Sequence, residues 1–249
     1  MAHTLLVRLA GPLQSWGSSS RFSVRSTENA PTRSGVIGLL ASALGLSRTA
    51  SLSEFDEVAF GVRVDAPGEL LEDFHTAHNA SGKAMPLSRR YYLQDAVFLA
   101  GLGSPQRETL ERYERALAAP HFLPFLGRRS CPPDGPLETR IVESDVRTAL
   151  RAEPWRAARA HARKRAVRTG RDLELLVDGL PGERGYEQRD RPLSFDPRER
   201  RYGSRTVVLL DPVRLHPDGS VGDAGPSTSS RPEASIDHDP MDVFEEDTL

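Results

Sequence analysis

Apolar runs and turn signals divide the first 120 residues into alternating strands and helices. Leu5–Leu9 is almost wholly apolar, which predicts a buried first strand. Residues 34–44 instead gather their apolar positions on one helical face, formed by Val36, Ile37, Leu40, Ala43 and Leu44. Ser34 can cap the start of this helix, and Gly45 can end it.

Four further strands are predicted in two pairs: 57–65 with 69–77, and 89–94 with 96–102. Ala66-Pro67-Gly68 is a turn signal between the strands of the first pair. A second helix is predicted over Pro105–Leu117, with Ser104 as its cap and proline in the first helical position. The order departs from the ferredoxin-like β-α-β-β-α-β succession by one extra strand. We therefore expect an α+β fold in which a sheet carries its helices on one face.

The pattern weakens beyond Pro120. Residues 121–136 hold four prolines and predict a long loop, and 149–169 is rich in Ala and Arg and is compatible with a helix. Two short apolar runs, 173–177 and 206–210, predict strands of a smaller β-containing C-terminal part. The expected divisions are residues 1–120, 121–216 and 217–249, the last of which is acidic, rich in Gly, Ser and Pro, and expected to be disordered.

Composition places the 249-residue chain among ordinary globular proteins, with 38% hydrophobic and 27% charged residues. No apolar run approaches the roughly 18 residues that a membrane span requires, and no signal peptide is evident. Cys131 is the single cysteine, which excludes an internal disulfide and a cysteine-based zinc cluster. Neither a cofactor nor a metal is expected, and the cytoplasm is the expected location.

The net charge of −2 conceals a basic body and an acidic end. Residues 217–249 contain nine acidic residues and one basic residue, so the remainder carries 32 basic and 26 acidic residues. Of the 33 basic residues, 31 are arginine, a bias that a GC-rich genome would also produce. Arginine nevertheless offers a planar fork for phosphates and a face that stacks on bases.

Two of three short blocks suggest nucleic-acid chemistry near the N-terminus. The block Leu-Gln-Ser-Trp-Gly presents Gln14 and Trp16 on a loop, where they could read and stack on a base, although the tryptophan could equally pack into the core. The block Pro-Thr-Arg-Ser-Gly places Arg33 and Ser34 at a helix N-terminus, which favours anions, unless this is ordinary capping. Arg21 and Arg25 lie just upstream and extend the basic character.

The third block, Phe-Leu-Gly-Arg-Arg-Ser-Cys-Pro, sets Arg128 and Arg129 in a loop after Gly127. One arginine can face RNA while the other braces the fold, or both can form salt bridges with acidic neighbours. Cys131 is more readily explained as a small packed residue than as a nucleophile. We expect Arg33 and Arg128 to contact RNA phosphates.

In this order and spacing, the three blocks and Asp73-Phe74-His75-Thr76 resemble the CasD family, part of the repeat-associated RNA-binding superfamily of CRISPR proteins. The resemblance runs over about residues 4–145. It implies a modified ferredoxin-like, RNA-recognition-like domain with a protruding thumb at about 78–90. It also implies a non-catalytic subunit of type I-E Cascade that holds the 5′ handle of the CRISPR RNA.

The same resemblance implies contacts with the backbone and large subunits and, indirectly, with target DNA. It assigns Lys83, Arg89 and Arg90, at the thumb position, to RNA or to a neighbouring subunit. The basic stretch 156–171, with seven Arg or Lys and no acid, is either a further nucleic-acid surface or a solvated segment.

The main alternative is a metal-independent endoribonuclease that processes precursor CRISPR RNA, as in type I-C systems. Such cleavage needs a base, an acid and a cation for the phosphate. Five residues within one stretch could supply them: His75, His78, Lys83, Tyr91 and Tyr92. A general RNA- or DNA-binding module outside CRISPR defence is a second alternative.

Overall fold

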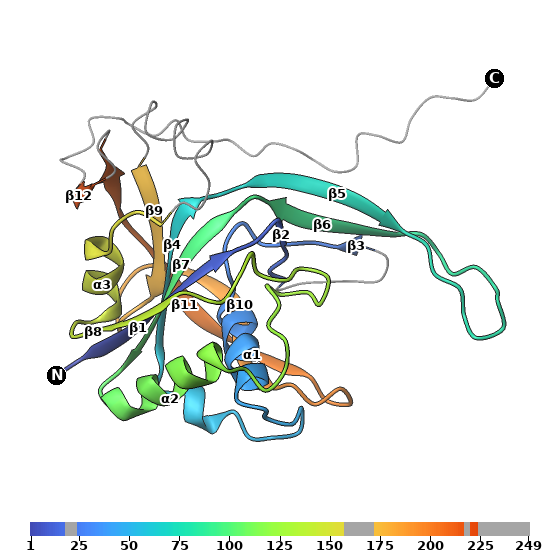
Figure 1. The fold of residues 1–249 in the computed structure, drawn as a ribbon, viewed down its shortest axis with the longest axis horizontal. Coiled ribbons are helices and arrows are strands. Elements are labelled where there is room, and N and C mark those ends of the chain that lie inside the picture. The colour runs from blue at the N-terminus through green and yellow to red at the C-terminus, as the bar shows by residue number, and fades with distance from the viewer. Residues whose placement is uncertain (18–23, 157–171, 217–219, 224–249) are drawn as a thin grey trace.

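The computed structural model describes residues 1–17, 24–156, 172–216 and 220–223. Arg21, nearly all of the basic stretch 156–171 and most of 217–249 lie outside the described residues. Within them, no helix is long and apolar enough to cross a membrane. Two β-sheets and three α-helices form the described fold, and one long hairpin projects from it (Figure 1).

The larger sheet has eight strands in the order β10-β11-β9-β4-β7-β1-β8, with β12 added to β11. Its strands are β1 (His3–Ala10), β4 (Ala59–Ala66), β7 (Val97–Ser104), β8 (Thr139–Val142), β9 (Asp172–Asp178), β10 (Tyr186–Ser194), β11 (Arg201–Leu215) and β12 (Val221–Asp223). Every pairing in this sheet is antiparallel. The predicted strands 173–177 and 206–210 correspond to β9 and to the centre of β11.

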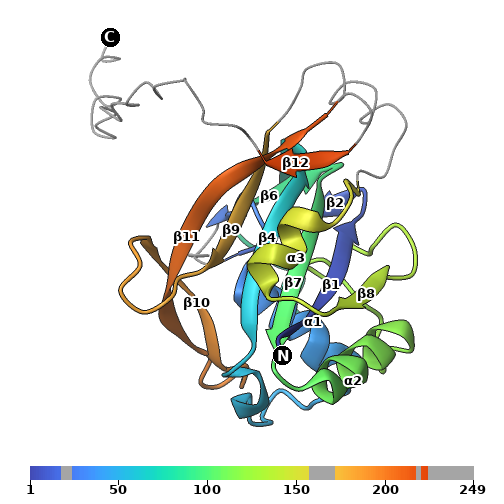
Figure 2. The ribbon, with the colours of Figure 1, turned by 90° about the vertical axis from the view of Figure 1, so that its left-hand side faces the viewer.

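The three helices divide between the two faces of this sheet (Figures 1 and 2). They are α1 (Arg33–Ala43), α2 (Arg107–Ala118) and α3 (Val146–Ala152). Alternate residues of β1 serve the two faces: Leu5 belongs to the core cluster that includes α1 and α2, whereas Leu6 belongs to the cluster that includes α3. The expectation that all helices lie on one face is therefore wrong, because β1 is apolar at successive positions and needs cover on both sides.

The predicted strand pairs are joined differently from the expectation. β4 pairs with β7, while β5 (Glu69–His75) pairs with β6 (Ser88–Gln94) in the second sheet. The four strands form one long ribbon that bends where Gly68 (φ +74) faces Asp95 (φ +55). A Cβ added at Gly68 would lie 2.5 Å from the Gln94 carbonyl oxygen, so the bend requires glycine there.

The second sheet carries β5 and β6 away from the body (Figure 1). Its other two strands are short: β2 (Leu13–Gln14) pairs antiparallel with β6, and β3 (Val24–Arg25) pairs parallel with it. The hairpin tip, residues 76–87, is exposed. Three of the eight basic residues that the sequence marked as RNA-binding lie in strands of this sheet, namely Arg25, Arg89 and Arg90, and Lys83 lies in the hairpin tip.

The C-terminal strands extend the large sheet, since β9 pairs with β4. The division expected near residue 120 thus falls between segments that share one sheet. The predicted helix over 149–169 begins within α3, but α3 ends at Ala152 and residues 153–156 are not helical, so this part of the prediction is wrong; residues 157–169 lie outside the described residues. A single turn of 3-10 helix, Ser53–Phe55, precedes β4.

Candidate RNA interface

The N-terminus of α1 is occupied by groups of the same chain. Thr32, not Ser34, is the N-cap, and its Oγ1 accepts a hydrogen bond from the backbone N–H of Gly35 at 3.2 Å. The backbone N–H of Arg33 donates to Asp190 Oδ2 at 2.7 Å, and Asp190 is fully buried. The helix N-terminus therefore binds an anion, as the sequence indicated, but the anion is an internal carboxylate.

Arg33 is buried, with 5% of its surface exposed. Its Nη1 donates to Asp178 Oδ2 at 2.8 Å, and its Nη2 donates to the Phe55 carbonyl oxygen at 2.9 Å. Burial lowers the pKa of Arg33, and the nearby Asp178 carboxylate opposes that shift. The predictions that Arg33 and Ser34 bind RNA are wrong, because both side chains are buried in the helix–sheet junction.

Gln14 and Trp16 also lie inside the protein, each with 0% exposure. The Gln14 Nε2 donates to the Leu9 and Ala96 carbonyls at 3.2 and 2.8 Å, and its Oε1 accepts from Trp16 Nε1 at 3.0 Å. A Cβ added at Gly35 would lie 2.7 Å from the Trp16 ring, so α1 packs directly on the indole. The prediction that these two residues contact a base is wrong: their polar groups satisfy each other and the backbone.

Arg128 braces the loop that carries the two neighbouring arginines. Its Nη1 donates to the Tyr91 carbonyl at 3.2 Å, and its Nη2 donates to the Arg25 and Ser26 carbonyls at 2.7 and 3.3 Å. The guanidinium carbon also lies 4.8 Å from the centre of the Tyr92 ring. Arg128 thus braces β3 and β6 while half-buried, and Arg129 is exposed; contact of either arginine with an RNA phosphate stays a prediction.

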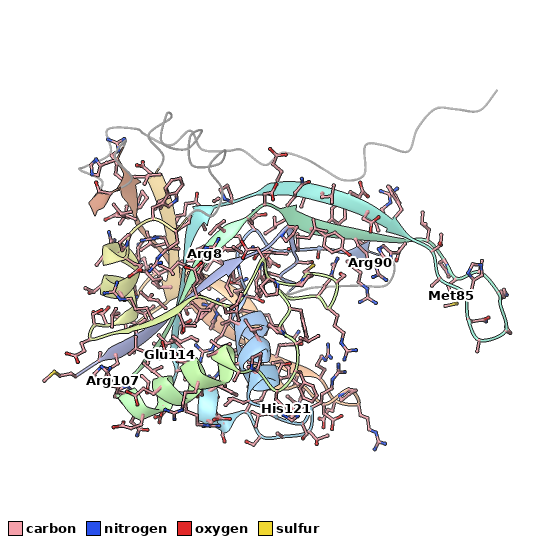
Figure 3. All side chains as sticks on the ribbon, viewed as in Figure 1. Arg8, Met85, Arg90, Arg107, Glu114 and His121 are labelled. Atoms are coloured by element: carbon pink, nitrogen blue, oxygen red, sulfur yellow. The ribbon has the colours of Figure 1, made fainter. Side chains whose placement is uncertain are left out.

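Two further arginines share the face of the second sheet on which Arg128 lies. Arg25 and Arg90 are register partners in the parallel β3–β6 pair, so their side chains are on the same face. Arg25 is exposed, and Arg90 is half-buried on β6 (Figure 3). Within the described part of the chain, Arg90 Nε is buried and has no hydrogen-bond partner. Arg25, Arg90 and Arg129, positioned by Arg128, are called the arginine face below.

The remaining basic residues of the hairpin lie elsewhere. Arg89 is on the opposite face of β6, above the Phe74 ring at 5.7 Å and 3.8 Å from Glu72. Lys83 is exposed at the hairpin tip, in a turn where its backbone N–H donates to Asn79 Oδ1 at 2.9 Å. The structure therefore separates Arg89 and Lys83 from the arginine face.

Comparison with known proteins decides the family. The model of a family described as CRISPR-associated protein (Cas_Cas5) matches residues 4–208. The chain belongs to the Cas_Cas5 family. It is 38% identical to the CRISPR system Cascade subunit CasD of Escherichia coli K12 over an alignment of length 174 that covers 60% of this chain and 76% of that protein.

Solved structures agree with this assignment. A chain of a CRISPR RNA-guided surveillance complex superposes with a TM-score of 0.68 at 34% identity, covering 89% of this chain and 91% of that one. A crystal structure of a Cas protein superposes with a TM-score of 0.67 at 36% identity, covering 90% and 100%. The resemblance to the CasD family is confirmed, and this member of the Cas_Cas5 family shares the α+β fold of its relatives.

The side chains considered for RNA cleavage do not form one group in this family member. His75 Nε2 lies 2.6 Å from Asp73 Oδ2, while the Tyr91 hydroxyl donates to Glu72 at 3.0 Å. Register pairs Glu72 with Tyr91, so His75, three positions beyond Glu72, points to the opposite face. Tyr92 is buried beneath Arg128.

Sequence reasoning missed the acidic partners of α1. Asp178 and Asp190 also bind Arg205, which donates to Asp178 Oδ1 at 2.8 Å and to Asp190 Oδ1 at 2.6 Å. These carboxylates are 145 and 157 positions from Arg33, so no local spacing could pair them with it.

Proposed function

We propose that the chain caps the 5′ handle of the guide RNA in a type I-E CRISPR interference complex and does not cut it. The arginine face is the observation that carries this proposal: Arg25 and Arg129 are exposed, and Arg90 has a buried N–H without a partner among the described residues. Guanidinium groups bind phosphates and stack on unpaired bases. Because Arg128 already holds its loop against Tyr91 and Arg25, RNA binding should lose little entropy in ordering that loop.

The strand order supports a ferredoxin-like core with a thumb. The chain runs through β1, α1, β4, β7, α2 and β8, and these strands are adjacent in the order β8-β1-β7-β4. The β5–β6 hairpin, inserted between β4 and β7, is then the thumb. Helices cover both faces of the core sheet, so we expect RNA on the hairpin and its flanking loops and not on an open sheet face.

Exposed apolar side chains along the hairpin support assembly with other subunits. They are Leu70, Leu71, Phe74, Met85 and Leu87 of the hairpin, and Val24 of the adjoining strand β3. Met85 lies near the far end of the hairpin (Figure 3), well placed for a neighbour to cover it. The backbone and large subunits of Cascade are the proposed partners, target DNA is contacted indirectly, and the cytoplasm is the compartment this role requires.

The test mixes the full-length chain with a labelled RNA of its own CRISPR repeat and with a scrambled RNA, in EDTA and across a salt series. Native gels measure binding, and denaturing gels measure cleavage. We expect selective retention of intact repeat RNA. Substituting Arg25, Arg90 or Arg129 with alanine should each reduce the slope of log K against log salt by about 0.7, the value for one phosphate contact on a single strand.

Arg115→Ala is the matched control, because Arg115 is an exposed arginine on α2. Its salt slope should equal that of the unmodified chain. Cutting at one position would favour the ribonuclease alternative, with His75 and His78 as the first residues to replace. Equal affinity for repeat and scrambled RNA, both alone and with the backbone subunits added, would refute recognition of the handle.

A further inference from the structure

Two side chains of the segment Asp73–Thr76 lie on the same side of the second sheet as the arginine face. Register pairs Asp73 with Arg90, and Arg90 with Arg25, so these three side chains share one face. His75 is two residues beyond Asp73 on β5 and points to that face as well. The hairpin therefore continues the arginine face towards its tip with a carboxylate and an imidazole.

Asp73 and His75 form a pair on this face. His75 Nε2 lies 2.6 Å from Asp73 Oδ2, and the side chains of His75 and Asp73 are 41% and 45% exposed, respectively. A pair this exposed adds little to stability, so the fold does not depend on it. The carboxylate accepts the Nε2 proton and orients the ring, which leaves Nδ1 for a ligand. Among the described residues, no hydrogen-bond partner is paired with Nδ1.

The charge of the pair disfavours a phosphate at His75. With a neutral imidazole the pair carries a net negative charge, and with a protonated imidazole it is neutral, so neither state attracts a further anion. A hydroxyl group suits both states, because it can donate to Nδ1 of the neutral ring and accept from Nδ1–H of the protonated ring. The ribose 2′-hydroxyl is such a group, and it is the feature by which proteins distinguish RNA from DNA.

A ribose of an RNA strand bound at the arginine face lies close to this pair. His75 and Arg90 are diagonal neighbours on adjacent antiparallel strands, an arrangement that separates their Cα atoms by about 7–8 Å. A phosphate is joined directly to the ribose of its own nucleotide, so a phosphate bound at Arg90 brings that sugar next to His75. The base projects from the other side of the ribose, which makes the sugar the first neutral group beside the bound phosphate.

We propose that His75 forms a hydrogen bond with one ribose 2′-hydroxyl of the bound RNA, and that Asp73 is the positioning residue that holds the imidazole. This inference rests on the proposed RNA-binding function and adds to it a source of preference for RNA over DNA. Contacts between arginines and phosphates do not supply that preference, because both nucleic acids carry the same phosphates. The pair thus contributes specificity, while the arginines contribute affinity.

The experiment measures binding of the full-length chain, by fluorescence anisotropy, to its own repeat RNA and to copies of that RNA in which one ribose at a time is 2′-deoxy. At one position or more, the deoxy sugar should weaken binding to the unmodified chain by about 2- to 12-fold, the range for one hydrogen bond. His75→Ala should weaken binding of the all-ribose RNA by the same factor. It should bind the all-ribose RNA and the RNA with that deoxy position equally, which completes a double-mutant cycle.

Three further variants separate a hydroxyl contact from a general effect on the hairpin. His78→Ala, the matched control, removes an exposed histidine of the hairpin tip and should keep the full deoxy effect. His75→Asn keeps a hydrogen-bonding group close to the ring and should restore part of it. Asp73→Ala removes a negative charge, so it should strengthen binding of every RNA, yet it should also reduce the deoxy effect at the His75-dependent position. A purely electrostatic role for Asp73 would change all affinities alike and leave the deoxy effect unchanged.

The salt dependence separates the pair from the arginines. His75→Ala should leave the salt slope unchanged, because it removes no phosphate contact, whereas Arg129→Ala should reduce the slope by about 0.7. Thermal melts establish that each variant is folded.

Two results would overturn the 2′-hydroxyl contact and leave RNA binding intact. In the first, every deoxy effect is as large in His75→Ala as in the unmodified chain. In the second, His75→Ala lowers the salt slope, which would make the imidazole a phosphate ligand. Cleavage of the repeat RNA that disappears in His75→Ala would instead make the pair catalytic and refute the non-cutting role. If no RNA binds the unmodified chain at low salt, alone or with the backbone subunits, the contact and the proposed RNA-binding function both fail.

Discussion

Replacing Arg33 with alanine should destabilise the protein without changing how it binds RNA. The side chain is 6% exposed, pairs with Asp178 at 2.8 Å and donates to the Phe55 carbonyl at 2.9 Å. Its removal leaves the Phe55 carbonyl without this hydrogen-bond donor and leaves Asp178 without one of its positively charged partners. Removing one partner of a buried pair costs about 3–5 kcal/mol.

The cost here should fall near the lower end of that range. Asp178 keeps Arg205 at 2.8 Å and the Phe60 backbone N–H at 2.9 Å, so its carboxylate stays partly satisfied. We expect a loss of about 3 kcal/mol, to which the missing aliphatic stem of the arginine also contributes. With a urea m-value of about 2 kcal/mol/M, the unfolding midpoint should fall by about 1.5 M.

Urea unfolding followed by far-ultraviolet circular dichroism measures this shift, and a salt series with repeat RNA measures the slope. Arg115→Ala, an exposed arginine on α2, is the control and should change stability by less than about 0.5 kcal/mol. An unchanged urea midpoint together with a shallower salt slope for Arg33→Ala would refute the reasoning. That outcome would mean that Arg33 faces RNA, as the sequence alone predicted.

Two other predictions concern the loop at Gly127 and the acid response of Glu183. Gly127 has φ +85, and a Cβ there would lie 1.8 Å from the Ser15 carbonyl oxygen, so Gly127→Ala should lower the free energy of unfolding by at least about 2 kcal/mol. Gly182 has φ +80 but open space around it, so the control Gly182→Ala should lower it by about 1 kcal/mol. Equal urea midpoints for the two variants would contradict this reasoning. The Arg147 hydrogen bond lowers the pKa of Glu183 from 4.5 to about 2, so its contribution to stability is present above pH 4.5 and is lost as the pH falls towards 2. Thermal melts from pH 7 to pH 2 should show a smaller acid loss for Glu183→Gln, and identical pH profiles would exclude the linkage.

The elements of the fold were more predictable than their pairing. Helix α1 lies within one residue of its predicted bounds, because a cap, an apolar stripe and Gly45 are all local signals. The partner strands of 57–65 and 96–102 were wrong, because Ala66-Pro67-Gly68 forms a bend and not a hairpin turn. The partner of a strand depends on the arrangement of the whole sheet. A turn signal such as Ala66-Pro67-Gly68 occurs both where a strand bends and where the chain reverses direction, so it does not identify that partner.

The candidate site was predictable where exposure follows from local sequence. Arg25, Arg90 and Arg129 keep the basic, accessible character that the sequence indicated, and their contact with RNA stays a prediction. Trp16 and Arg33 are not accessible as the sequence indicated, because their burial depends on elements that are distant in the chain. The residues around Trp16 form a Gly/Ser-rich loop, and nothing in that local sequence predicts that Gly35 packs against the indole.

The long separation between α1 and its two carboxylates has a consequence during protein synthesis. Asp178 and Asp190 leave the ribosome 145 and 157 residues after Arg33. At the usual 5–20 residues per second, the guanidinium waits roughly 7–30 s for its counter-ions. Over that interval β4 also has an open edge, because β9 is still unmade. The nascent chain therefore carries an unpaired strand edge and an uncompensated positive charge together, and the synthesis of β9 removes the open edge and supplies the first counter-ion, Asp178, in one step.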